Sequence, residues 1–199
     1  YFPTSLTLRF PGQTYIAISW NFLHNSMRTI FPKKNFSTAL QSTTKPVKKF
    51  RSNWWKKIKK SSQYLAAYSC VRQLTFGNLD MAYHTITAPV DDAIAFEKAA
   101  IDKTLVLPDV EGTLIAPQFS HIFSGGYAAG YYGYKWAEVL DADAFSVFKA
   151  NGIFDPVTAT SFRDNILKRG GTENPMILYK RFKGSEPTID ALMRRDGII

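Results

Sequence analysis

The first 79 residues of this 199-residue chain contain no Asp or Glu, although they hold 13 Lys and Arg. In an ordinary domain about a quarter of the residues are charged and roughly half of those are acidic, so about nine acids are expected in a stretch of this length. Residues 80–199 hold the other 12 Lys and Arg and all 16 acids. The two parts of the chain therefore need different explanations.

Composition bounds the class of protein. With 45% hydrophobic residues the chain can bury one core, and its length suggests one domain or at most two. It has no run of 18 apolar residues, so no membrane-spanning helix is expected. The single Cys70 excludes a disulfide within the chain, and three His residues leave little material for a zinc site.

The segment 1–55 is basic, free of acids and without the regular pattern of a helical domain. Short runs at 6–10 and 14–20 have the composition of strands, whereas 25–49 lacks any period, which is typical of loop or disorder. A stretch translated in a shifted reading frame would explain the missing acids. A transit peptide is a weaker explanation, because Lys outnumbers Arg. We expect a boundary between this segment and residues 56–199.

Residues 45–60, KPVKKFRSNWWKKIKK, combine eight Lys and Arg with Phe50, Trp54 and Trp55. Cations neutralise phosphates and aromatic rings stack on bases, so one interpretation is a site for nucleic acid or for an anionic membrane. The alternative is a solvated, basic start of a helix, since basic clusters alone are common. A steep loss of binding with added salt would favour the first interpretation.

From about residue 57 the apolar residues recur at spacings close to three and four, which predicts a helix ending near Phe76–Gly77. Asp91 and Asp92 are candidate caps of the next helix, which carries residues 94–101. Residues 106–118 contain two Pro and one Gly and are predicted to form a loop.

The remaining helices are framed by Pro starts and Gly stops. A long helix is expected over 127–150, and Asn151–Gly152 would end it. Three shorter helices are predicted to begin at Asp155–Pro156, Asn174–Pro175 and Pro187, and to end at Gly170–Gly171, near Gly184 and before Gly197. The fold class is therefore all-α, without repeats and without βαβ alternation.

Three tyrosines, Tyr127, Tyr131 and Tyr134, have the spacing i, i+4, i+7 and are expected on one face of the 127–150 helix. Three hydroxyls on one face can donate hydrogen bonds to backbone carbonyls or to a developing oxyanion. The alternative is half-buried packing, which is the commoner role of tyrosines at helical spacing.

The residues just before these tyrosines add to the pattern. Gly125 and Gly126 have no side chains, which permits a close approach of the backbone or motion of a loop. His121 is a further hydrogen-bond donor, although a histidine taken alone is more often structural.

The segment HIFSGGYAAGYYGYKWAEVLDADAF (121–145) closely resembles a C-terminal segment of the thimet oligopeptidase, oligopeptidase A and peptidyl-dipeptidase family of zinc metallopeptidases. The resemblance continues through FRDNILKRGGTENPMILYKRFKGSEPTIDALMRRDGI (162–198). It extends back through KKIKKSSQYLAAYSCVRQL and LDMAYHT, so that it covers roughly residues 56–199. The Gly-Gly-Tyr block, with its tyrosine spacing and the Trp-Ala-Glu that follows, is its most specific part.

The resemblance implies the helical C-terminal portion of a larger, cleft-containing catalytic domain of the zincin type. In that family a His and two Tyr hold the backbone of the substrate, and two Gly belong to a flexible loop that approaches it. These positions match His121, Tyr127, Tyr131, Gly125 and Gly126 of this chain. A tyrosine at the position of Tyr134 helps to stabilise the tetrahedral oxyanion.

The zinc site of the family is missing here. The family binds Zn²⁺ through H-E-x-x-H on one helix and a Glu on the next, with the Glu of the motif as general base. No H-E-x-x-H occurs in this chain; its other two His are His24 and His84, and His84 is expected to be structural. The resemblance thus implies a fragment of a longer enzyme, with no zinc ligand and no activity of its own.

The implied partners are short peptide substrates and the missing N-terminal part of the enzyme, with no nucleic acid. One Cys, no signal-peptide pattern and the family resemblance predict a cytoplasmic protein. Two other hypotheses stand beside this one. The first is a helical domain that the basic segment 45–60 attaches to nucleic acid or anionic lipid. The second is a truncated, non-functional product.

Overall fold

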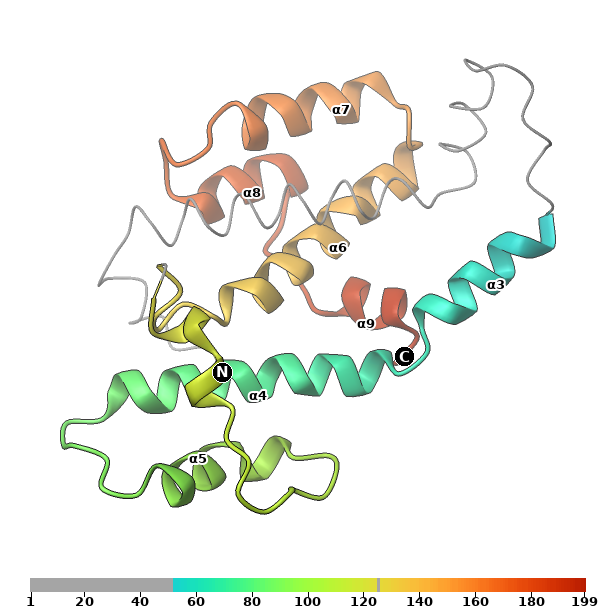
Figure 1. The fold of residues 1–199 in the computed structure, drawn as a ribbon. Helices are drawn as coiled ribbons and strands as arrows, with labels where there is room; N and C mark the ends of the chain where they lie inside the picture. Colours follow the sequence, from blue (N-terminus) through green and yellow to red (C-terminus); the bar gives the residue numbers. More distant parts are fainter. Residues whose placement is uncertain (1–51, 125) are drawn as a thin grey trace, which may run out of the picture. The chain divides into compact units, whose positions relative to one another are not determined.

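The structure is a computed structural model that describes residues 52–124 and 126–199 (Figure 1). The candidate strands at 6–10 and 14–20, most of the segment 1–55 and Gly125 lie outside the described residues. Within those ranges all regular structure is helical, which confirms the predicted all-α class. The α-helices are α3 (Ser52–Ser62), α4 (Ala66–Thr85), α5 (Ala93–Ile101), α6 (Gly133–Asn151), α7 (Pro156–Phe162), α8 (Pro175–Lys183) and α9 (Asp190–Asp196).

The chain divides into two compact units. Among the described residues the first unit holds Ala67–Lys135, and the second holds 52–66 and Trp136–Ile199. None of the helices in the described ranges has the length and apolar character needed to cross a membrane.

The core of the first unit forms between α4, α5 and the loop that leads to α6 (Figure 1). Its buried members are Leu79, Ile101, Ile122 and Tyr131, and aromatic side chains pack around them. Leu79 and Ile122 are completely inaccessible to solvent. Because Ile122 and Tyr131 come from the loop, this core fixes the conformation of the segment that carries the candidate site residues.

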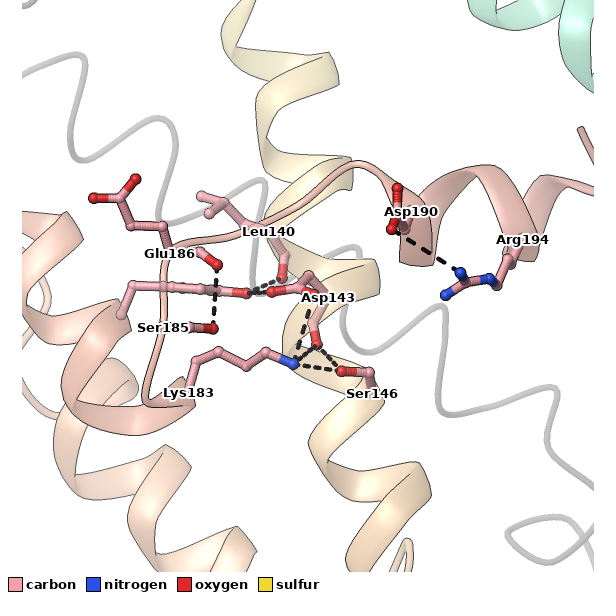
Figure 2. A network of polar contacts seen from close by, with 9 residues as sticks. Leu140, Asp143, Ser146, Lys183, Ser185, Glu186, Asp190 and Arg194 are labelled. Atoms are coloured by element: carbon pink, nitrogen blue, oxygen red, sulfur yellow. Dashed lines mark hydrogen bonds and ion pairs between the residues drawn. The ribbon is translucent and has the colours of Figure 1, made fainter. Parts of the chain in front are cut away.

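The core of the second unit is built on one face of α6. Buried residues of α6 follow a helical spacing and meet aromatic residues of α7 and α8, namely Phe162, Tyr179 and Phe182. Beside this core, Tyr179 donates to Asp143 Oδ2 at 2.7 Å, and Lys183 Nζ donates to Ser146 Oγ at 2.7 Å (Figure 2). Burial and the Asp143 carboxylate raise the pKa of Tyr179 far above its usual range, so this phenol remains a donor.

Several predicted helix ends are confirmed by their capping contacts. The Asp92 carboxylate accepts from the N–H groups of Ile94 and Ala95, and the Asp155 carboxylate accepts from Thr158. At the C-terminal ends, Gly184 and Gly197 have φ of 86° and 72°, the left-handed conformation that ends a helix at little cost for glycine.

The helix predicted from residue 57 to Gly77 is wrong in both of its limits. Leu65 has a φ of 55° and separates α3 from α4, and α4 then continues through Gly77 to Thr85. A Cβ at Gly77 would lie 4.0 Å from the Cα of Tyr132. This glycine thus has room for a Cβ at an ordinary contact distance and does not mark a helix end.

The single helix predicted over 127–150 is also wrong at its start. The helix α6 begins only at Gly133, and residues 127–132, here called the tyrosine turn, form consecutive hydrogen-bonded turns. Ala129 has a φ of 54°, which no α-helix accommodates.

Two smaller differences concern other helices. The last helix begins at Asp190, three residues after Pro187. The helix from Pro156 widens into a π-helical turn, η5 (Arg163–Leu167), in which the N–H of Lys168 donates to the carbonyl of Arg163. The loop predicted over 106–118 is correct apart from a short 3₁₀ turn, η3 (Ala116–Gln118).

Candidate functional site

The three tyrosines of the predicted site lie together, although the tyrosine turn places them and not one helix face. The rings of Tyr127 and Tyr134 stack with their centroids 4.9 Å apart, and the rings of Tyr131 and Tyr134 lie 5.0 Å apart. Tyr134 is in the first turn of α6, whereas Tyr127 and Tyr131 belong to the tyrosine turn. The prediction that the three side chains share one location is therefore correct, and its geometric reason is not.

Two further rings close these three into a loop of contacts. His121 stacks on Tyr127 at 5.7 Å and on Phe119 at 5.7 Å, and Phe119 meets the edge of Tyr131 at 5.1 Å. We call these five residues, Phe119, His121, Tyr127, Tyr131 and Tyr134, the ring circuit. Contacts of this kind stabilise by about 0.5–1.5 kcal/mol each beyond the burial of area, so the five rings hold one another in place.

The three tyrosines differ in burial, and this difference limits what each hydroxyl can contact. Tyr131 is only 8% exposed, and its hydroxyl donates to Gln73 Oε1 at 3.1 Å. Burial raises the pKa of Tyr131, partly offset by the bond to Gln73. In this arrangement the Tyr131 hydroxyl makes a hydrogen bond inside the first unit.

Tyr134 is half-buried and contacts two rings of the ring circuit, those of Tyr127 and Tyr131. Burial, and next its hydrogen bond with Tyr127, raise the pKa of Tyr134 well above its usual range. Because a phenol with a raised pKa keeps its proton at neutral pH, Tyr134 can act as a hydrogen-bond donor but not as a general base.

The outer rim of the ring circuit is accessible. His121 is exposed, Tyr127 is half-buried and Gly126 is exposed. Gly126 has a φ of 86°, a conformation that favours glycine, and no atom lies within 4 Å of the place its Cβ would take. A ligand could therefore approach the backbone here.

The carboxylate of Asp80 accepts hydrogen bonds from the backbone of the tyrosine turn. Asp80 is completely buried on α4, and its carboxylate accepts from the N–H groups of Ala129 and Tyr131, both at 2.9 Å. His84 Nδ1 lies 3.0 Å from Asp80 Oδ1 and 2.7 Å from the Asp80 carbonyl oxygen. Both of these atoms are acceptors, so Nδ1 is the nitrogen that carries the proton. Burial raises the pKa of Asp80, although the two N–H groups and His84 oppose the shift.

A second buried carboxylate fixes the chain before His121. Glu97 of α5 is 3% exposed and accepts from the N–H groups of Ile115 and Ala116 at 2.5 and 3.0 Å. Sequence reasoning missed both carboxylates. The available signal was their setting, since each stands among apolar residues on a helix, and Asp80 is the first acid of the chain.

The described residues do not fit a zinc site. Across 52–124 and 126–199, no group of three or more His, Cys, Asp or Glu side chains could hold a metal ion. The ring of His84 contacts Asp80, and the ring of His121 lies between two other rings of the ring circuit.

A surface hollow of about 440 Å³ lies on the connection between α4 and α5. It is lined by Thr85–Asp92 and Phe96, and it contains none of the predicted site residues. Elsewhere, the four lysines of α3, Lys56, Lys57, Lys59 and Lys60, are exposed. The basic segment continues to residue 45 outside the described residues, and its binding to nucleic acid or lipid stays a prediction.

Comparison with known proteins supports the resemblance seen in the sequence. The chain is 49% identical over 142 residues to oligopeptidase A of Haemophilus influenzae, an alignment that covers 70% of the chain and 21% of that protein. It is 34% identical over 145 residues to dipeptidyl carboxypeptidase of Salmonella typhimurium, covering 71% and 21%. Saccharolysin of Saccharomyces cerevisiae is 32% identical over 167 residues, covering 83% and 24%.

These relatives are peptidases by name, and the chain spans about a fifth of their length. The sequence profile of peptidase family M3 matches residues 25–198, which is most of the chain. The boundary expected at residue 55 stays a prediction. The match over both compact units, together with the three relatives, confirms the predicted family: the chain belongs to peptidase family M3.

Proposed function

We propose that this chain supplies the substrate-binding and oxyanion-stabilising side of the peptide cleft of a zinc-dependent oligopeptidase or peptidyl-dipeptidase. The observation that carries the proposal is the ring circuit. It stacks His121 on Tyr127, and Tyr127 on the half-buried phenol of Tyr134. The names of the relatives, oligopeptidase A and dipeptidyl carboxypeptidase, support peptides as the substrate class.

Tyr134 has the central role in the proposal. Hydrolysis of a peptide bond places negative charge on the former carbonyl oxygen, and a fixed hydroxyl donor stabilises that charge more than the ground state. Tyr134, like any phenol, carries its proton at neutral pH, and the stacking of Tyr127 fixes the direction of the ring. A donor held in this way needs little reorganisation during the reaction.

The accessible rim would hold the backbone of the peptide. His121 is exposed and can donate to a peptide carbonyl, and Tyr127 can do the same. Gly126 offers backbone without a side chain, and Gly125 is included by the family resemblance alone. A direct contact of Tyr131 with substrate, expected from the resemblance, stays a prediction. In this structure the Tyr131 hydroxyl donates a hydrogen bond to Gln73.

In the complete enzyme, the ligands of the Zn²⁺ and the general base would be supplied by parts of the protein outside this chain. We therefore expect that the chain alone retains no stoichiometric zinc after dialysis. Metal analysis that finds one tightly held zinc per chain would contradict this. A cytoplasmic location also stays a prediction, since the relatives from Arabidopsis thaliana include one named cytosolic and one named organellar.

The substitution Tyr134→Phe in a complete enzyme that carries this segment tests the proposal. The variant keeps the ring, and hence its stacking, but loses the hydroxyl. Removing one oxyanion donor typically lowers kcat by about 10²–10³-fold. We expect a loss of this size with little change in Tm.

Tyr64→Phe is the matched control, because Tyr64 is 77% exposed and undergoes the same chemical change. It should leave both kcat and Tm unchanged. A Tyr134→Phe variant with unchanged kcat and a lowered Tm would show that Tyr134 is a packing residue.

A further inference from the structure

We propose that Asp80 is a positioning residue: its buried carboxylate fixes the tyrosine turn and, through it, the placement of Tyr127 and Tyr134. The inference rests on the proposed function for its catalytic meaning and on the contacts of Asp80 for its geometry. Asp80 makes no contact with a reacting group in this proposal, because it acts only through the backbone of the turn.

The Asp80 carboxylate is buried and makes two separate contacts with backbone N–H groups. The side chain has no exposure to solvent, and its two oxygens accept separately, Oδ1 from the N–H of Ala129 and Oδ2 from the N–H of Tyr131. The two donors lie 49 and 51 residues further along the chain. A single side chain of α4 therefore determines the conformation of a distant segment.

The tyrosine turn requires such support. Ala129 has a φ of 54°, and in this left-handed region its Cβ crowds the following carbonyl oxygen. Nothing local offsets that cost, since the residue is Ala and not Gly or Asn. A buried carboxylate that accepts the N–H groups on either side of Gly130 stabilises this conformation against the helix that the sequence pattern predicts.

The turn transmits this constraint to the rings. The N–H of Gly130 donates to the carbonyl of Tyr127 at 2.8 Å, and the N–H of Tyr134 donates to the carbonyl of Tyr131 at 3.2 Å. The first bond joins Tyr127 to Gly130, which lies between the two residues that Asp80 holds, and the second joins Tyr134 to Tyr131, which Asp80 holds directly. If the carboxylate is lost, the stacking of Tyr127 on Tyr134 changes.

His84 orients the carboxylate. Its Nδ1–H faces Asp80 Oδ1 at 3.0 Å from one turn further along α4. The ring of His84 also approaches the ring of Phe123, with centroids 6.1 Å apart. His84 therefore contacts Oδ1, the same carboxylate oxygen that accepts from the N–H of Ala129.

Glu97 provides a matched comparison within the same unit. It is likewise a buried carboxylate that accepts from two backbone N–H groups, but these belong to Ile115 and Ala116 and not to the tyrosine turn. A purely structural role predicts equal consequences for Asp80→Asn and Glu97→Gln. A positioning role predicts that the first variant alters Tyr127 and Tyr134 clearly more than the second does.

The first experiment observes the rings directly in the full chain. The protein is labelled with 3-fluorotyrosine, and the ¹⁹F resonances of Tyr127 and Tyr134 are assigned from the Tyr127→Phe and Tyr134→Phe variants. Asp80→Asn replaces one acceptor by an amide NH₂, which cannot accept from a backbone N–H. We expect both resonances to shift by more than a linewidth in Asp80→Asn, and by clearly less in Glu97→Gln, which reaches these rings only through the chain before His121.

A compensating variant guards against failure to fold. Glycine adopts a φ of 54° at little cost, so Ala129→Gly should return the Asp80→Asn resonances toward their original positions. If Asp80→Asn alone does not fold, folding of Asp80→Asn/Ala129→Gly with native resonances supports the proposal. Failure of that double variant to fold overturns it, because Asp80 would then serve the core and not the turn.

The second experiment measures turnover in a complete enzyme that carries this segment. A misplacement of about 1 Å can cost about 10²-fold, so Asp80→Asn should lower kcat by about 10- to 100-fold with a smaller change in KM. The double variant Asp80→Asn/Tyr134→Phe should have about the same kcat as Tyr134→Phe alone, because both changes affect the same donor.

The outcomes separate this inference from the proposed function. Unshifted ¹⁹F resonances in Asp80→Asn overturn the inference, whatever happens to turnover. An unchanged kcat in Tyr134→Phe overturns the proposed function, while shifted resonances in Asp80→Asn still support the placement of the turn by Asp80. Fully additive losses in the double variant also overturn the inference.

Discussion

Tyr131 and Tyr134 are three residues apart and in ring contact, yet their surroundings give the two hydroxyls different roles. The Tyr131 hydroxyl donates to Gln73 in the interior, whereas Tyr134 is half-buried beside Tyr127. Ring type and spacing alone cannot distinguish these roles. Substitutions that remove only the hydroxyl can do so.

Tyr131→Phe should therefore lower stability and leave turnover largely intact. The change deletes the donor to Gln73 Oε1, and loss of a partly buried hydrogen bond typically costs about 0.5–1.5 kcal/mol. For a chain of this size that corresponds to a fall in Tm of roughly 2–4 °C per kcal/mol. Thermal unfolding of the full chain measures it. An unchanged Tm, or a loss in kcat as large as that of Tyr134→Phe, would contradict the supporting role of Tyr131.

At the scale of elements, α4 shows why a glycine is an ambiguous signal. Gly77 lies within the helix, and the residues that follow it, Leu79 and Asp80, are completely buried. Burial of Leu79, and the backbone N–H groups that the Asp80 carboxylate accepts, stabilise the continued helix by more than the glycine weakens it. The chain breaks instead at Leu65, where φ is positive.

Gly77→Ala is expected to stabilise the protein by about 0.5–1 kcal/mol, because alanine loses less entropy in a helix. The new Cβ would meet Tyr132 Cα at 4.0 Å, an ordinary contact distance. Urea unfolding should show a raised midpoint with an unchanged slope. The control is Gly184→Ala, whose φ of 86° makes alanine strained, with an expected loss of about 1 kcal/mol. A destabilised Gly77→Ala variant would contradict the expectation.

The start of α7 should respond to acid. Hydrogen bonds with the Thr158 side chain, and next with its N–H, lower the pKa of Asp155. A lowered folded-state pKa means that the stabilisation is complete above the unfolded value of about 3.9 and is lost as the pH falls through the folded pKa. Asp155→Asn keeps a capping oxygen but does not titrate. The difference in urea midpoint between wild type and variant should shrink between about pH 5 and about pH 2. A difference independent of pH would contradict this.

At the scale of the whole molecule, Arg195 joins segments of the second unit that lie far apart in the sequence. Its Nη1 lies 2.7 Å from Oδ2 of Asp141, a residue of α6 that is 1% exposed, and its carbonyl accepts from Gln63 Nε2. The contacts connect the C-terminal helix α9 to α6 and to the residue that follows α3. The second unit is therefore closed by its last residues.

Arg195→Met should destabilise the chain by about 3 kcal/mol or more, because it removes the guanidinium from a buried carboxylate while keeping an apolar side chain. The neighbouring Arg194→Met is the control. Arg194 reaches Asp190 only at 4.0 Å on the surface, so its loss should cost at most about 1 kcal/mol. Urea unfolding compares the two, and equal losses would contradict a special role for Arg195.

The sequence by itself determined the class of the fold and most helix ends. Caps are local: an Asp or Asn side chain accepts from an N–H two or three residues away, and a glycine turns left-handed because it lacks a Cβ. For this reason Asp92, Asp155, Asn174, Gly184 and Gly197 end or begin helices where the pattern predicts. The family resemblance likewise depends on residue types in order, and it selected six residues. Of the five that are described, Tyr127 and Tyr131 contact the ring of Tyr134, His121 stacks on Tyr127, and Gly126 is next to Tyr127 in the sequence.

Only the tertiary structure decided how those residues are held. The period of the tyrosines predicts a helix from residue 127, but the Asp80 carboxylate, 49 residues upstream of Ala129, stabilises a turn with a left-handed residue there. Likewise, burial of Leu79 carries α4 past Gly77. The free energy of such contacts depends on groups far away in the chain being brought together without water, and no window of local sequence contains that information.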